Sequence, residues 1–162
     1  MKGSWQARPF ELGTDGPGTI VVGIDDSPSA LRALAYAAGL ARRNGSPLVA
    51  VHVRGAGPSV LSWGSCAPID ASSLLTQAAY EGRDAVETAL RDEVGQLAKS
   101  WGIRIEFVVR DGERLKELAA VADAYHADAV IVGASTRLGS RLAGSLAVRL
   151  VRQRNWPVTV VP

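Results

Sequence analysis

The sequence is poor in residues that form disulfides or bind metals. Among 162 residues there is one cysteine, Cys66, and there are two histidines, His52 and His126. A single cysteine cannot form a disulfide within the chain, which indicates a reducing compartment. One thiol and two isolated histidines offer no ligand cluster at the spacing of a zinc site. We therefore expect neither a disulfide nor a metal centre.

Long hydrophobic runs are also missing. No apolar stretch approaches the roughly 18 residues of a membrane span, and residues 1–18 lack the apolar centre of a signal peptide. We expect these residues to form a loosely ordered leader before a domain at 19–162. The expected location is cytoplasmic, without a membrane partner.

Acidic residues are absent from 129–162, although the whole chain has 16 of them and 18 basic ones. Five arginines in that segment make it locally electropositive, which suits an anionic ligand. Nucleic acid is not the expected partner, because Arg149, Arg152 and Arg154 span less than two helical turns without interleaved aromatic residues. We interpret these three as a solvated helix face.

The chain does contain five short apolar runs that alternate with helical patterns. The runs are rich in β-branched residues, as expected of strands covered on both faces. Strands are predicted at 19–24, 48–53, 104–109, 129–132 and 158–161. Helices are predicted at 28–44, about 74–100, 115–125 and 145–154. Residues 54–73 form a long Gly, Pro and Ser-rich connection, for which a flap and a partner contact both remain open.

Five strands alternating with four helices predict a doubly wound α/β fold, with helices on both faces of a five-stranded parallel sheet. Ligands bind in such sheets beyond the carboxyl ends of the strands, where the strand order reverses. Two strand ends are chemically rich: Asp25-Asp26 after the first strand, and a Gly and Arg loop after the fourth. Order 3-2-1-4-5 places them side by side, so we predict that order. His52, inside the second strand, is interpreted as a packed core residue.

A candidate phosphate site follows the fourth strand. Residues 130–145 read as a strand, a loop of Gly, Ser, Thr and Arg, and a helix start at Gly144-Ser145. The free N–H groups at a helix N-terminus attract anions, and glycines let backbone amides approach phosphate oxygens. A turn between strand and helix also collects glycines and a capping serine without any ligand, and the pattern alone leaves both interpretations open.

Three stretches of the chain resemble the universal stress proteins. They are Val-Val-Gly-Ile-Asp-Asp-Ser at 21–27, Val-Ala-Val-His-Val at 49–53, and the segment from Val-Ile-Val-Gly at 130–133 to the ending Trp-Pro-Val-Thr-Val-Val-Pro. In the nucleotide-binding branch of that family, a loop resembling G-x2-G-x9-G-[ST] holds phosphates and ribose. An Asp after strand one and the residue after the strand-two His contact the base. The residues that match these positions are Asp25, Val53, Gly133, Gly144 and Ser145.

The loop departs from the family pattern in two ways. Thr136 stands at the position of the second glycine, and the loop is two residues shorter. Gly139 could take over the backbone role of that glycine. Arg137 and Arg141 could offset the lost amides, because guanidinium groups donate charged hydrogen bonds to phosphate.

The resemblance implies a protein that binds ATP, ADP or AMP and acts in stress response or signalling as a homodimer, paired through its last strand. The alternative is a homologue that binds no nucleotide and serves as a dimeric interaction module. Asp25 and Asp26 could hold Mg²⁺ beside the phosphates, although Asp-Ser-Pro is more simply a helix cap. No catalytic residue is expected, and slow ATP hydrolysis is the most that we predict.

Overall fold

The structure, a computed structural model, describes residues 18–55, 69–134 and 146–162, with side chains described from residue 82 onward in the second range. The strands are β1 (Thr19–Ile24), β2 (Leu48–Arg54), β3 (Ile105–Asp111), β4 (Ala127–Gly133) and β5 (Val158–Val161). The helices are α1 (Pro28–Asn44), α2 (Ile69–Trp101), α3 (Arg114–Ala124) and α4 (Leu146–Gln153). Strands and helices alternate as the sequence predicts.

The strands form one parallel sheet in the order β3-β2-β1-β4-β5, which confirms the predicted order. β1 lies at the centre, paired with β2 on one side and β4 on the other. The connections leave β1 in opposite directions, so the strand order reverses between β1 and β4. Their carboxyl ends therefore flank the position at which doubly wound sheets bind ligands.

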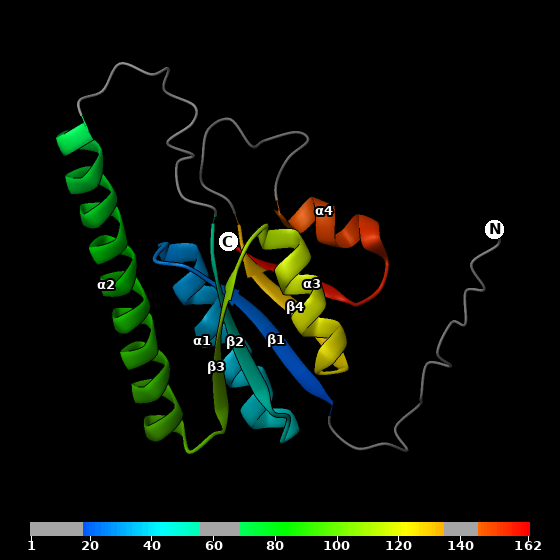
Figure 1. Cartoon of the computed structure of the whole chain (residues 1–162). Helices are drawn as coiled ribbons and strands as arrows, with labels where there is room; N and C mark the ends of the chain where they lie inside the picture. The colour runs from blue at the N-terminus through cyan, green and yellow to red at the C-terminus, as the bar shows by residue number, and fades with distance from the viewer. Residues whose placement is uncertain (1–17, 56–68, 135–145) are drawn as a thin grey trace, which may run out of the picture.

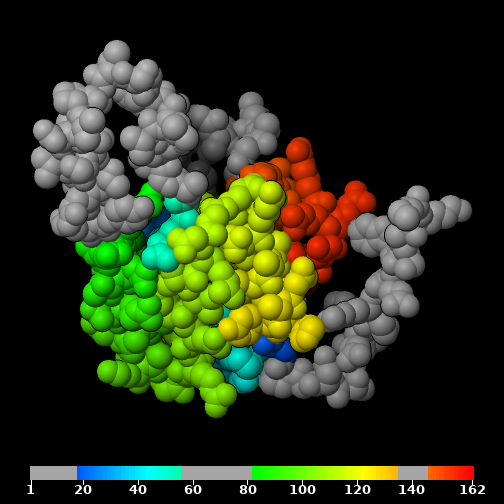
Figure 2. Space-filling model, in the orientation of Figure 1, coloured from blue at the N-terminus to red at the C-terminus, as the bar shows by residue number. Residues whose placement is uncertain are grey.

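Helices α1 and α2 cover one face of the sheet, and α3 and α4 cover the other (Figure 1). Alternate residues of β1 separate into two cores, because successive side chains of a strand point to opposite faces. Val22 belongs to the core under α1 and α2, and Val21 to the core under α3 and α4. Figure 2 shows α3 and α4 side by side on the second face.

Helix α1 follows β1 through a capped turn. The Ser27 hydroxyl accepts a hydrogen bond from the Ala30 N–H at 3.2 Å, and Pro28 occupies the first helical turn. Gly45 ends the helix in the left-handed region at φ 69°, a conformation that favours glycine. Ser27, Pro28 and Gly45 confirm the helix boundaries that the sequence predicts. No helix in the described part of the chain is long and apolar enough to cross a membrane.

Three predicted elements were too short at one end by two or more residues. β3 ends at Asp111, because Arg110 and Asp111 continue the ladder opposite Val53 and Arg54. β4 begins at Ala127, which pairs with Thr19. α2 begins at Ile69, five residues before the predicted start. Polar residues at these ends suggest turns by composition, whereas backbone pairing extends the strands through them.

Candidate functional site

Asp25 follows β1 at the point where the strand order reverses. Along β1, alternate side chains place Asp25 on the same face as Val21 and Gly23, the face that α3 covers. Its Oδ1 accepts a hydrogen bond from the Ser27 N–H at 3.0 Å. This bond shapes the turn into α1 and leaves Oδ2 toward α3. Asp25 therefore combines a turn-forming role with an accessible acceptor.

Val53 lies next to Asp25 at the same sheet edge. Each residue is one position beyond the paired residues Ile24 and His52. The Val53 side chain is 8% exposed and belongs to the core that contains Leu115 of α3. The structure thus brings together the two residues to which the family resemblance assigns the base.

His52 joins the ends of β1 and β2 through a buried hydrogen bond. Its ring is buried, and Nδ1 lies 3.1 Å from the carbonyl oxygen of Ile24. A carbonyl accepts, so Nδ1 carries the proton in this hydrogen bond. The bond joins the ends of β1 and β2 directly before Asp25 and Val53. The predicted core role of His52 is confirmed, and it has a positioning consequence for the site.

Gly133, the last residue of β4, is required by the packing of α1. A Cβ atom there would lie 2.6 to 2.7 Å from backbone atoms of Ser29 and Ala30, closer than atoms can approach. The first turn of α1 therefore rests directly on the end of β4. The sequence suggests that this glycine lets backbone amides approach a phosphate. The structure shows that it lets the backbone of α1 approach the end of β4.

The first turn of α3 brings charged groups to the edge. Arg114 Nη1 lies 3.8 Å from Asp25 Oδ2. The Glu113 carboxylate accepts a hydrogen bond from the Arg149 guanidinium of α4 and lies 3.6 Å from Lys116 Nζ. The hydrogen bond from Arg149 lowers the pKa of Glu113. Arg149 is exposed, as expected of a solvated helix face, and its side chain also joins α4 to the residue that precedes α3.

A second charged group lies where β2 and β3 end. Arg54 Nη2 donates to Asp111 Oδ2 at 2.8 Å, and Arg54 Nη1 lies 3.5 Å from Glu87 Oε2 on α2. The hydrogen bond to Asp111 raises the pKa of Arg54. Sequence patterns do not reveal this group, because its members come from three separate elements. It ties α2 to the sheet beside Val53.

Six predicted binding residues lie outside the described residues: Thr136, Arg137, Gly139, Arg141, Gly144 and Ser145. The structure describes the elements at both ends of their loop. β4 ends at Gly133 and α4 begins at Leu146. The loop therefore leaves the sheet from the strand end beside Asp25 and leads into the helix that Arg149 ties to α3.

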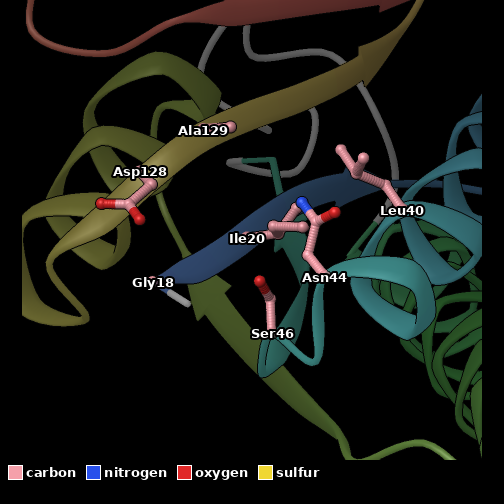
Figure 3. A pocket seen from close by; sticks show the side chains of 7 residues that line it. All are labelled: Gly18, Ile20, Leu40, Asn44, Ser46, Asp128 and Ala129. Atoms are coloured by element: carbon pink, nitrogen blue, oxygen red, sulfur yellow. The ribbon is translucent and has the colours of Figure 1, made fainter. Parts of the chain in front are cut away.

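A surface pocket of about 440 Å³ lies at the opposite end of the sheet (Figure 3). Its lining residues come from the amino ends of β1 and β4 and from the end of α1: Gly18, Ile20, Leu40, Asn44, Ser46, Asp128 and Ala129. Parallel sheets bind ligands at their carboxyl edge, so this pocket is not the site that the topology indicates. Among the described residues, no three His, Cys, Asp or Glu side chains group as metal ligands.

The sheet order and the acidic residue at the end of β1 define a doubly wound α/β domain with its ligand edge between β1 and β4. The universal stress protein family model matches residues 17–162, and the chain belongs to that family. A universal stress protein of Methanocaldococcus jannaschii is 29% identical over 146 residues, covering 88% of this chain and 80% of the relative.

Two similar solved structures carry ligands in their names. A universal stress protein in complex with cAMP has a TM-score of 0.65 at 24% identity and covers 90% of this chain and 97% of its own. The universal stress protein from Archaeoglobus fulgidus in complex with dAMP has a TM-score of 0.58 at 24% identity, with coverages of 90% and 98%. At these identities the likeness shows the shared fold.

Proposed function

We propose that this protein binds an adenine nucleotide at the carboxyl edge between β1 and β4 and acts in stress response or signalling as a homodimer. The base contacts Asp25 and the backbone of Val53. The phosphates contact the loop that includes Gly144 and Ser145. We expect the protein to work by binding, with slow ATP hydrolysis at most.

The observation that carries this proposal is the placement of Asp25. Its Oδ1 is held by the Ser27 N–H, so the carboxylate has a fixed orientation before a ligand arrives. Asp25 lies at the reversal of strand order, one position beyond the Ile24–His52 pair, and its Oδ2 lies 3.8 Å from Arg114 Nη1. A preorganised acceptor at this position suits the amino group of an adenine base.

Two observations on relatives support the choice of ligand. The chain belongs to the universal stress protein family, and two proteins of similar fold are complexes with cAMP and dAMP. Both ligands combine an adenine base with a phosphate. A compact site with one acceptor for the base and a glycine loop for the phosphate suits both parts.

The loop composition favours longer phosphate chains. Arg137 and Arg141 replace neutral backbone donors with charged ones, and a hydrogen bond from a guanidinium to phosphate is about twice as strong as a neutral one. We expect ATP and ADP to bind more tightly than AMP and adenosine. The difference should shrink as salt is added, because exposed charges are screened.

Calorimetric titration of ATP into the wild-type protein and two variants tests the proposal. Asp25→Asn removes the charged acceptor and should weaken binding by about 1.5 to 3 kcal/mol. Asp128→Asn removes the same charge from an exposed aspartate at the opposite end of the sheet and serves as the matched control. Thermal unfolding of all three proteins should show that each is folded.

An ATP affinity of the Asp25→Asn protein equal to that of the wild type would reject the base contact and leave Asp25 its turn-forming role. Absence of binding by the wild type to ATP, ADP, AMP and adenosine would reject the nucleotide function altogether. In that case the dimeric interaction module becomes the function to test.

A further inference from the structure

Asp25 and Arg114 are close without forming a hydrogen bond. The distance of 3.8 Å between Arg114 Nη1 and Asp25 Oδ2 exceeds the 2.7 to 3.2 Å of an N–H···O bond. The Asp25 side chain is 36% exposed and that of Arg114 is 55% exposed. Asp25 Oδ2 is therefore not occupied by a hydrogen bond from Arg114, and both side chains are partly exposed to solvent.

The packing of α3 places Arg114 at this position. Leu115 and Leu118 anchor the helix in the core that also contains Val53. Gly23 of β1 permits the close approach, since a Cβ atom there would lie 3.2 Å from Leu118 Cδ2. Arg114 precedes these anchors and is the first residue of the helix.

We propose that Arg114 is a base-contacting residue outside the glycine motif, which donates a hydrogen bond to adenine N7 while Asp25 Oδ2 accepts from the adenine amino group. This inference rests on the proposed adenine-nucleotide function and adds the group that selects the base. The two side chains offer a donor and an acceptor side by side.

The chemistry of purine edges gives this pair its selectivity. Adenine presents the N7 acceptor beside the N6 amino donor, which complements Arg114 and Asp25. Guanine presents two acceptors, N7 and O6, on the same edge. Its O6 would face the Asp25 carboxylate, and two oxygen acceptors repel. Arg114 and Asp25 together therefore favour adenine over guanine.

Titrations of adenosine, 7-deazaadenosine and guanosine test this assignment in the full chain. Adenosine lacks phosphates, so its affinity reports base contacts. Arg114→Ala should weaken adenosine binding roughly tenfold, the expected loss for one charged hydrogen bond at an exposed site. The affinity of Arg114→Ala for ATP should fall by the same factor. Lys116→Ala is the matched control, because Lys116 lies on the same helical turn and pairs with Glu113.

The analogue separates a hydrogen bond from a structural effect. The compound 7-deazaadenosine lacks N7. The wild type should therefore bind it about as weakly as Arg114→Ala binds adenosine. Arg114→Ala should bind 7-deazaadenosine with the same affinity as the wild type does. Guanosine should bind the wild type more weakly than adenosine does. Arg114→Lys keeps the charge and should bind adenosine with intermediate affinity, which provides a second variant if Arg114→Ala is unstable.

The outcomes distinguish the two proposals. If the wild type binds adenosine and both Arg114→Ala and Lys116→Ala bind it with the same affinity as the wild type, the role of Arg114 is overturned. The nucleotide function then still stands. Equal losses for adenosine and 7-deazaadenosine in Arg114→Ala would overturn the contact to N7. Failure of the wild type to bind adenosine, ATP, ADP and AMP would overturn the nucleotide function itself.

Discussion

At the scale of single residues, the site depends on groups whose structural and binding roles coincide. Asp25 shapes the turn into α1 through one carboxylate oxygen and presents the other at the ligand edge. His52 fixes the strand ends that carry Asp25 and Val53. If the proposed site is correct, a change at these positions alters folding and binding together, so each variant needs a stability measurement beside its affinity.

Gly133 gives the sharpest stability prediction at this scale. In Gly133→Ala the new methyl group would overlap the backbone of Ser29 and Ala30, so we expect a loss of about 1 to 3 kcal/mol in the free energy of unfolding. Gly95→Ala is the control, because an added Cβ on α2 meets nothing within 4 Å. Alanine favours a helix there and should stabilise by about 0.5 to 1 kcal/mol.

Urea unfolding of the two proteins measures both effects. A Gly133→Ala protein as stable as the wild type would show that α1 and β4 can separate without cost. The close approach of α1 would then not be the reason for this glycine.

At the scale of elements, the site is an arrangement of helix ends around two strand ends. Arg149 of α4 bonds Glu113, which directly precedes α3, and α3 carries Arg114 toward β1. The helix that follows the proposed phosphate loop is thus linked to the helix that carries Arg114.

The Glu113–Arg149 ion pair predicts a pH dependence of stability. The pKa of Glu113 is lowered in the folded protein, so folding favours the ionised carboxylate. Its stabilising contribution is present above the ordinary glutamate pKa and is lost as pH falls through the lowered folded value. Glu113→Gln should therefore destabilise the protein at neutral pH and have little effect in acid, below the folded pKa.

Urea unfolding of wild type and Glu113→Gln across this pH range measures the difference. Glu93→Gln removes an exposed glutamate of α2 and is the control. A difference between wild type and Glu113→Gln that stays constant with pH would show that the ion pair contributes nothing.

The edge strand β5 leads to a prediction about assembly. β5 pairs with β4 alone in the described sheet, and Val160 is 44% exposed. Exposed strand edges are sites of pairing with a second chain, and we propose that β5 pairs with the same strand of a second copy. Val160→Lys should convert the dimer to a monomer, because it places two charges near the two-fold axis. Ala120→Lys adds the same charge on α3 and should leave the dimer intact.

Light scattering coupled to size-exclusion chromatography gives the molar mass of each protein. A monomeric wild type, or a Val160→Lys protein that remains a dimer at micromolar concentration, would contradict assembly through β5.

At the scale of the whole molecule, the fold was predictable because its signals are local or follow from chemistry at strand ends. The sheet order followed from the need to place Asp25 beside the loop after β4, and pairing of β1 with β4 confirms it. The capped turn at Ser27 and the helix end at Gly45 are short-range signals. Such signals need no knowledge of distant contacts.

The charged groups around the site were not predictable in the same way. The spacing of Leu115 and Leu118 shows which side of α3 is buried, but no pattern in the sequence shows that Arg114 meets Asp25. The ion pair between Arg149 and Glu113 was not predicted either, because helical spacing alone does not reveal a partner on another element. The strand end at Asp111 was missed because its pairing with Arg54 is a tertiary contact.

Binding of an adenine nucleotide is the central claim, and native mass spectrometry of the freshly purified protein tests it most directly. We predict a dimer that carries the added mass of one adenine nucleotide per chain, retained by wild type and reduced in Asp25→Asn. The ligand released on denaturation should be identified as ATP, ADP or AMP. A wild-type protein that carries no nucleotide, and acquires none when ATP is added, would contradict the claim.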